Sequence, residues 1–101
     1  MGACNFIEFE VAKTKEEAFS SLVKSAVFFY GHDPYNGTIS TTYLSRKPAK
    51  VIRKRFTKKA EQEAVKVAEA DGWGEKREAR AIDCGATKGG HMWAFYGWAA
   101  C

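Results

Sequence analysis

The sequence predicts an α+β fold: a four- to five-stranded, mostly antiparallel sheet with two helices on one face, in the ferredoxin-like order β-α-β-β-α-β-β. Three observations lead to this prediction. Residues 5–11 alternate apolar and acidic side chains, residues 15–30 carry an apolar stripe at helical spacing, and residues 92–99 are apolar on both faces. With 101 residues, of which 46% are hydrophobic, we expect one domain over residues 1–101.

The first strand and the first helix have the clearest signals. The strand alternates with a period of two along Ile7, Glu8, Phe9, Glu10 and Val11. Thr14 and Glu17 have the spacing of a capping box, which begins the helix, and Gly31 occupies the position that commonly ends one. The stripe expected to face the sheet consists of Phe19, Leu22, Val23, Ala26, Val27 and Tyr30.

The middle of the chain combines turn residues with short extended segments. Residues 31–37 predict a loop, residues 38–45 a strand, and residues 50–56 a basic edge strand, because Pro48 is close by. Thr57 is the predicted cap of a second helix that runs to about residue 70 and stops at Gly72. Its inner face consists of small side chains: Ala60, Ala64, Val67 and Ala68.

Two further strands are expected at the C-terminal end, over residues 75–84 and 92–99. The last segment is apolar on both faces, with Trp93 and Trp98 on opposite sides. A strand of this kind is covered on both sides, so it belongs in the middle of the sheet.

Positive charge is concentrated in one segment. Residues 34–60 contain no acidic residue, and removing the eight cations of this segment from the net charge of +4 leaves −4 on the rest of the chain. Such a cluster speeds encounter with an anionic partner, which could be nucleic acid, a nucleotide or an acidic protein surface. The alternative is a solvated edge strand and helix start whose lysines prevent aggregation. The cations are Arg46, Lys47, Lys50, Arg53, Lys54, Arg55, Lys58 and Lys59.

Aromatic residues accompany this charge. Tyr35 and Tyr43 lie upstream of the Arg53–Phe56 segment, and basic residues interleaved with aromatics are typical of single-strand nucleic-acid binding. The alternative is that these rings belong to the core. Trp73 lies between two glycines, which predicts either an exposed binding anchor or packing against the end of the second helix.

The loop residue His32 directly follows the predicted helix C-terminus. The helix dipole favours a capping role for a charged imidazole there, and partner binding is the alternative. Catalysis would need a nucleophile within hydrogen-bond reach, with His91 or Cys84 as candidates to complete the site. The glycine-rich residues 85–90 lack the Walker spacing, so we expect no enzyme activity, no cofactor and no metal.

The chain has three cysteines, Cys4, Cys84 and Cys101, and no evident signal peptide. An odd number of cysteines without secretion favours a reducing cytoplasm over a disulfide framework. No apolar run approaches the roughly 18 residues that a membrane span needs, so no membrane partner is expected.

Two segments carry a resemblance to a known family. They are residues 30–39, Tyr-Gly-His-Asp-Pro-Tyr-Asn-Gly-Thr-Ile, and residues 95–99, Phe-Tyr-Gly-Trp-Ala. Together they resemble a family of small uncharacterised proteins from bacteriophages and prophages. The basic residues 46–59 are not part of that pattern. The resemblance brings no site residues; it implies an accessory phage gene, a class that often encodes inhibitors of host defence that act by binding.

The sequence therefore predicts a cytoplasmic, non-enzymatic binding protein. We expect residues 46–59 to dock on an acidic or nucleic-acid-binding surface of a bacterial host protein, with Trp73 or the 31–37 loop as anchor. Direct nucleic-acid binding is the first alternative. The second is a homo-oligomer that sequesters a nucleotide between subunits, with His32 and nearby arginines on its phosphates.

Overall fold

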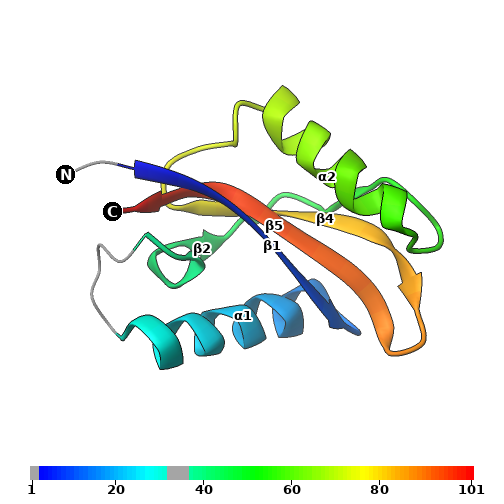
Figure 1. The fold of residues 1–101 in the computed structure, drawn as a ribbon, viewed down its shortest axis with the longest axis horizontal. Coiled ribbons are helices and arrows are strands. Elements are labelled where there is room, and N and C mark those ends of the chain that lie inside the picture. Colours follow the sequence, from blue (N-terminus) through cyan, green and yellow to red (C-terminus); the bar gives the residue numbers. More distant parts are fainter. Residues whose placement is uncertain (1–2, 32–36) are drawn as a thin grey trace.

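The computed structural model, which describes residues 3–31 and 37–101, is a five-stranded mixed sheet with a helix on each face (Figure 1). It confirms the α+β class. The strand order is β1-β5-β4-β2, and β3 also pairs with β4. In chain order the elements are β1 (Ala3–Ala12), α1 (Lys15–Tyr30), the 3-10 helix η1 (Ile39–Thr41), β2 (Tyr43–Leu44), β3 (Lys50–Val51), α2 (Lys58–Ala70), β4 (Glu78–Thr87) and β5 (Gly90–Ala100).

Strand β5 lies between β1 and β4 and is antiparallel to both. It pairs with β1 in one unbroken register from Ala3 opposite Ala100 to Ala12 opposite His91. The prediction that the apolar C-terminal strand lies in the interior of the sheet is confirmed. On the other side, the β4–β5 register shifts between Asp83 and Ala86, where β4 bulges.

The outer side of β4 differs from the sequence prediction. Strands β2 and β3 run parallel to β4, so the sheet is mixed rather than mostly antiparallel. The long strand expected over residues 38–45 is replaced by η1 and the two-residue β2. Threonine side chains explain the difference, because they bond to nearby backbone and compete with a strand ladder: Thr38 accepts from the Ser40 amide at 3.3 Å, and Thr42 donates to the Ile39 carbonyl at 2.7 Å.

The two helices lie on opposite faces of the sheet, not on one face as predicted (Figure 1). On β4, Ala81 belongs to the core under α1, whereas the next residue, Ile82, belongs to the core under α2. Successive strand residues point to opposite faces, so each face has its own apolar layer. Composition could not reveal this, because Ala and Ile are equally suited to either face.

The predicted helix boundaries are confirmed. The Thr14 hydroxyl accepts from the Glu17 amide at 3.2 Å, and α1 ends at Tyr30, where Gly31 takes φ 77° and donates to the Val27 carbonyl at 2.8 Å. In α2 the small-residue stripe is buried as expected, through Ala60, Ala64 and Ala68. Tyr30 differs: it was expected on the inner stripe of α1, but 64% of it is exposed.

Glu8 lies on the α1 face of β1, and its Oε2 is buried without a hydrogen-bond partner in the structure. Burial raises the pKa of this carboxyl, so the folded state holds the charged form at a cost that disappears once the group is protonated. We expect Glu8→Gln to raise the free energy of unfolding at neutral pH, because burying a neutral amide costs less than burying a carboxylate. Urea unfolding checks this, and the difference from wild type should shrink as the pH falls and Glu8 takes up its proton; a variant less stable than wild type at neutral pH contradicts it.

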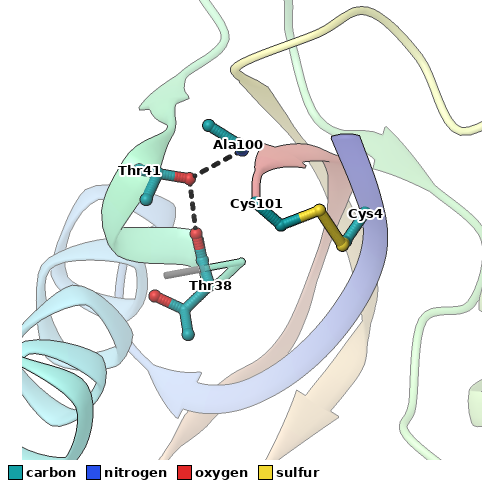
Figure 2. Close-up of a disulfide and its surroundings, with 5 residues drawn as sticks. All are labelled: Cys4, Thr38, Thr41, Ala100 and Cys101. Carbon is teal, nitrogen blue, oxygen red and sulfur yellow. Dashed lines mark hydrogen bonds between the residues drawn. A yellow bond between two sulfur atoms is a disulfide. The ribbon is translucent and has the colours of Figure 1, made fainter. Parts of the chain in front are cut away.

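A disulfide joins the two ends of the described chain (Figure 2). Cys4 on β1 bonds to Cys101, which contradicts the expectation that no disulfide forms. The same end of the sheet is tied to η1, because Thr41 Oγ1 accepts from the Ala100 amide at 3.1 Å and donates to the Thr38 carbonyl at 2.9 Å. The pairing escaped the sequence prediction because the two cysteines become neighbours only through the β1–β5 register.

Cys84 remains as a free thiol and is fully buried. Its burial, followed by the charge of Asp83, raises the pKa of the thiol to about 12. We therefore expect no fast-reacting thiol in the native protein at about pH 8, because the reactive thiolate is both scarce and shielded. Titration with Ellman's reagent checks this: one thiol should react after unfolding, and three after unfolding with reduction. Rapid reaction of the native protein would contradict the buried position of Cys84.

A basic edge as candidate functional site

The basic residues 46–59 follow the outer margin of β4, from the end of β2 to the first turn of α2 (Figure 1). Backbone bonds hold this segment to β4. The amides of Ser45, Ile52 and Phe56 donate to the Ala79, Asp83 and Ala86 carbonyls at 2.8, 3.0 and 3.1 Å, and the Ala86 amide donates to the Lys54 carbonyl at 2.8 Å. Ile52 and Phe56 pack into the core under α2, which leaves the intervening cations outside. We call the exposed cations of this segment the basic edge: Arg46, Lys47, Lys50, Lys54, Arg55, Lys58 and Lys59.

Arg53 is the one cation of the segment that is not part of the basic edge. Its Nε donates to the Glu63 carboxylate on α2 at 3.1 and 3.2 Å, and Nη2 also contacts Glu63. The hydrogen bond from Arg53 lowers the pKa of Glu63, and the same bond raises the pKa of Arg53. The charge of Arg53 is therefore already balanced within the protein.

The basic edge presents charge on both faces of the sheet margin. Lys50 pairs with Ile82 and lies on the α2 face, where it borders a hollow with Val67, Ala70, Asp71 and Tyr96. Arg55 bridges to Ala86 and lies on the α1 face, since the adjacent Phe56 packs under α2. The expected second basic strand over residues 50–56 is thus only Lys50–Val51 followed by an isolated bridge. The cations therefore form a narrow rim with charge on both faces of the sheet margin, and they do not form one flat surface.

At the β2 end of the basic edge, an exposed aromatic ring stands beside two cations. Tyr43 is 56% exposed and lines an open hollow with Ser45, Arg46, Lys47 and Glu78. Of the two tyrosines predicted to accompany the charge, Tyr43 is therefore on the surface and not in the core. Tyr35 and His32 lie outside the described residues.

On the α2 face of the same sheet margin, two acidic side chains are bonded to Arg80 and Tyr96. Tyr96 Oη donates to Asp71 at 2.6 Å, and Arg80 bonds to both Asp71 and Glu78. The Tyr96 hydrogen bond lowers the pKa of Asp71, while burial raises the pKa of Tyr96 to about 12. Within the described part of the chain, the ion pairs of these acids are with Arg80, while the more distant charge of Lys47 on the basic edge adds to the lowering of the Asp71 pKa.

Trp73 does not stand out as an exposed anchor. It adopts φ 64°, donates its amide to the Ala68 carbonyl at 2.8 Å, and packs half-buried against the core under α2. Of the two predictions for this residue, packing against the helix end is the one observed.

Two features were missed by the sequence prediction. The end of α1 exposes three consecutive aromatics, Phe28, Phe29 and Tyr30, at 82%, 75% and 64%. Successive helix residues are about 100° apart, so three in a row cannot all face the sheet, and this signal was available. The second feature is an Asp83–His91 pair, with Nδ1 and Oδ1 2.9 Å apart, which only the β4–β5 pairing brings together.

Comparison with known proteins finds no matching family model, no matching curated protein and no matching solved structure. Within residues 3–31 and 37–101, neither helix has the length and apolar character that crossing a membrane requires. The functional assignment therefore depends on the geometry and charge of the site.

Proposed function

We propose that this chain is a small, non-enzymatic binding protein that inserts its basic edge into an acidic cleft of a partner protein. The observation that carries the proposal is the rim of seven exposed cations; the eighth cation of the segment, Arg53, pairs internally with Glu63. The resemblance to phage and prophage proteins adds the setting: the partner is a protein of the bacterial host, and masking its surface inhibits it.

The shape of the basic edge favours a concave partner. Lys50 and Arg55 lie on opposite faces of the margin, so a flat surface could reach only one of them, whereas the two walls of a cleft could reach both. The partner's surface must be acidic, because a nucleic-acid-binding surface is itself basic and like charges repel across an interface. The basic edge would also accelerate association by electrostatic steering.

Charge reversal on the basic edge tests this proposal. We expect Lys47→Glu, Lys50→Glu and Lys54→Glu together to reduce retention of the partner from nuclease-treated bacterial lysate at least about tenfold, because attraction becomes repulsion. The matched control reverses the same number of exposed charges elsewhere: Lys13→Glu, Lys24→Glu and Lys76→Glu. Quantitative mass spectrometry of the retained proteins is the measurement. Equal loss in both variants would indicate a net-charge effect, and an unchanged set of retained proteins would exclude the basic edge; either result contradicts the proposal.

Single-stranded nucleic acid is the second candidate, and one observation favours it. The exposed Tyr43 ring beside Arg46 and Lys47 combines a stacking surface with charges for the phosphates. This alternative predicts that oligothymidine binds with log K falling against log salt by about 0.7 per neutralised phosphate. It also predicts that Tyr43→Ala weakens binding by about 1–3 kcal/mol, whereas Tyr30→Ala, an equally exposed tyrosine on α1, does not. Fluorescence anisotropy across a salt series checks both, and the absence of binding at low salt removes this alternative.

A further inference from the structure

The β4–β5 hairpin forms an open hollow beside the end of the basic edge. Its lining residues are Arg55, Ala86, Thr87 and Lys88. Arg55 bridges to Ala86, and Ala86 pairs with His91 on β5, so these residues form one row across three neighbouring backbones. Paired residues of neighbouring strands point to the same face, and Ala86 contributes only a methyl group. The Arg55 and His91 side chains therefore project from the same face of the sheet, on either side of the small Ala86 side chain.

His91 is held in a defined orientation. Its Nδ1 lies 2.9 Å from Asp83 Oδ1, and the same oxygen accepts the Gly85 amide at 3.0 Å. The Asp83 side chain is 13% exposed and that of His91 is 41% exposed, so a buried carboxylate supports a ring that reaches solvent. A second support is Trp93, the cross-strand partner of Asp83, whose ring centroid is 5.8 Å from that of His91. Because the carboxylate accepts the Nδ1 proton, Nε2 is the nitrogen left for a ligand.

We propose that this hollow binds the phosphate group of a phosphomonoester. Adjacent strands are about 4.8 Å apart, so Arg55 and His91 start about 10 Å from each other, which places a phosphate above Ala86 within reach of both side chains. The Arg55 guanidinium matches two phosphate oxygens, and Lys88, which also lines the hollow, supplies a further donor. His91 lies across Ala86 from Arg55 and adds an Nε2 donor when its ring is protonated. Donors from Arg55, Lys88 and His91 together suit a monoester, which carries up to two charges, better than a singly charged diester.

The site stands apart from the proposed protein-docking role. It shares Arg55 with the basic edge, but Asp83, Lys88 and His91 come from β4, β5 and their turn. It therefore assigns a function to the glycine-rich hairpin and to the Asp83–His91 pair. The Lys47→Glu, Lys50→Glu and Lys54→Glu variant should still bind phosphate, so failure of one proposal is distinguishable from failure of the other.

The test is an NMR titration of the full chain with inorganic phosphate at about pH 6.5, where phosphate carries between one and two charges. We expect saturable amide shifts confined to residues 54–56 and 85–91, absent with sodium chloride of equal ionic strength. Arg55→Gln and His91→Asn should each weaken binding at least about tenfold, since each removes a charge-assisted hydrogen bond. Asn keeps an N–H for Asp83 but lacks Nε2. Lys59→Gln, which removes a cation on α2 outside the hollow, should change nothing.

Several results would overturn the proposal: shifts that follow chloride equally, affinity unchanged in both variants, or dimethyl phosphate binding as tightly as phosphate. If His91→Asn fails to fold, Arg55→Gln and Lys88→Gln decide the question, because both side chains line the open hollow. O-Phosphoserine and adenosine 5′-monophosphate identify the source of the phosphate. Tighter binding of the first indicates a phosphorylated protein, tighter binding of the second indicates a nucleotide, and binding of neither overturns the monoester assignment.

Discussion

Replacing both Cys4 and Cys101 with serine is expected to lower the free energy of unfolding by about 3–5 kcal/mol. The disulfide joins residues 97 positions apart, so it closes nearly the whole chain into one loop in the unfolded state. A cross-link removes more entropy from the unfolded chain as its loop lengthens, and this loop is close to the longest that 101 residues allow. A domain of this size is commonly stable by only about 5–15 kcal/mol, so the loss would be a large part of the total.

Urea unfolding at 25 °C of the oxidised wild type, the reduced wild type and the double variant measures this effect. We expect the reduced protein and the variant to share a lower midpoint, and reduction to leave the variant unchanged. Reduction should not affect Cys84, which is already a thiol. Equal midpoints for oxidised and reduced wild type would contradict a stabilising cross-link between the ends of β1 and β5.

Gly97→Ala is expected to cost about 3 kcal/mol or to prevent folding. Gly97 lies in the interior strand β5, and a Cβ there would stand 2.1 Å from the Glu78 carbonyl oxygen and 3.3 Å from the Phe6 ring. The first contact is with backbone, which cannot rotate away. Relief would require β4 and β5 to separate where their pairing begins, and this is also where the Arg77 amide donates to the Trp98 carbonyl at 2.7 Å.

Gly72→Ala is the matched control. It follows α2 at φ 62°, and a Cβ there would meet no atom within 4 Å, so the substitution carries only the left-handed backbone penalty of about 1 kcal/mol. Thermal and urea unfolding of the two variants give the comparison. Equal costs would contradict the close approach of the Glu78 carbonyl to β5.

Local physical chemistry was sufficient to predict several elements. The Thr14 cap, the Gly31 terminus and the alanine stripe of α2 all follow from interactions within a few residues, and each is present. The interior position of β5 was predictable because a strand with apolar residues on both faces has to be covered twice. These features depend on the spacing of residue types along the chain, which can be read directly from the sequence.

The features that were not predicted depend on distant pairings. Which face each helix covers depends on whether it packs against Ala81 or Ile82, two adjacent residues with no local signal for one helix or the other. The disulfide requires the β1–β5 register, and the short β2 reflects local threonine bonds that replace a ladder. Parallel pairing to β4 adds another contact that no spacing rule reveals.

For the candidate site, the sequence predicted the charge but not its arrangement. The run of cations is evident in residues 46–59, but the sequence does not show which cations are free. Glu63 of the following helix pairs with Arg53, and the bulge at Gly85 lets the Arg55 backbone approach β4. A Cβ at Gly85 would stand 2.3 Å from the Arg55 carbonyl carbon. The basic edge is thus a product of β4, α2 and the cationic segment together.

Lysine footprinting in nuclease-treated bacterial lysate tests whether the basic edge is a binding surface. The protein is acetylated briefly, free or in lysate, and the labelling of each lysine is compared by mass spectrometry. We expect lysate to protect the basic-edge lysines, Lys47, Lys50, Lys54, Lys58 and Lys59, while the exposed Lys13, Lys24 and Lys76 label as in the free protein. Equal labelling of both groups in lysate, at a protein concentration where a partner is in excess, would contradict the basic edge as a binding surface.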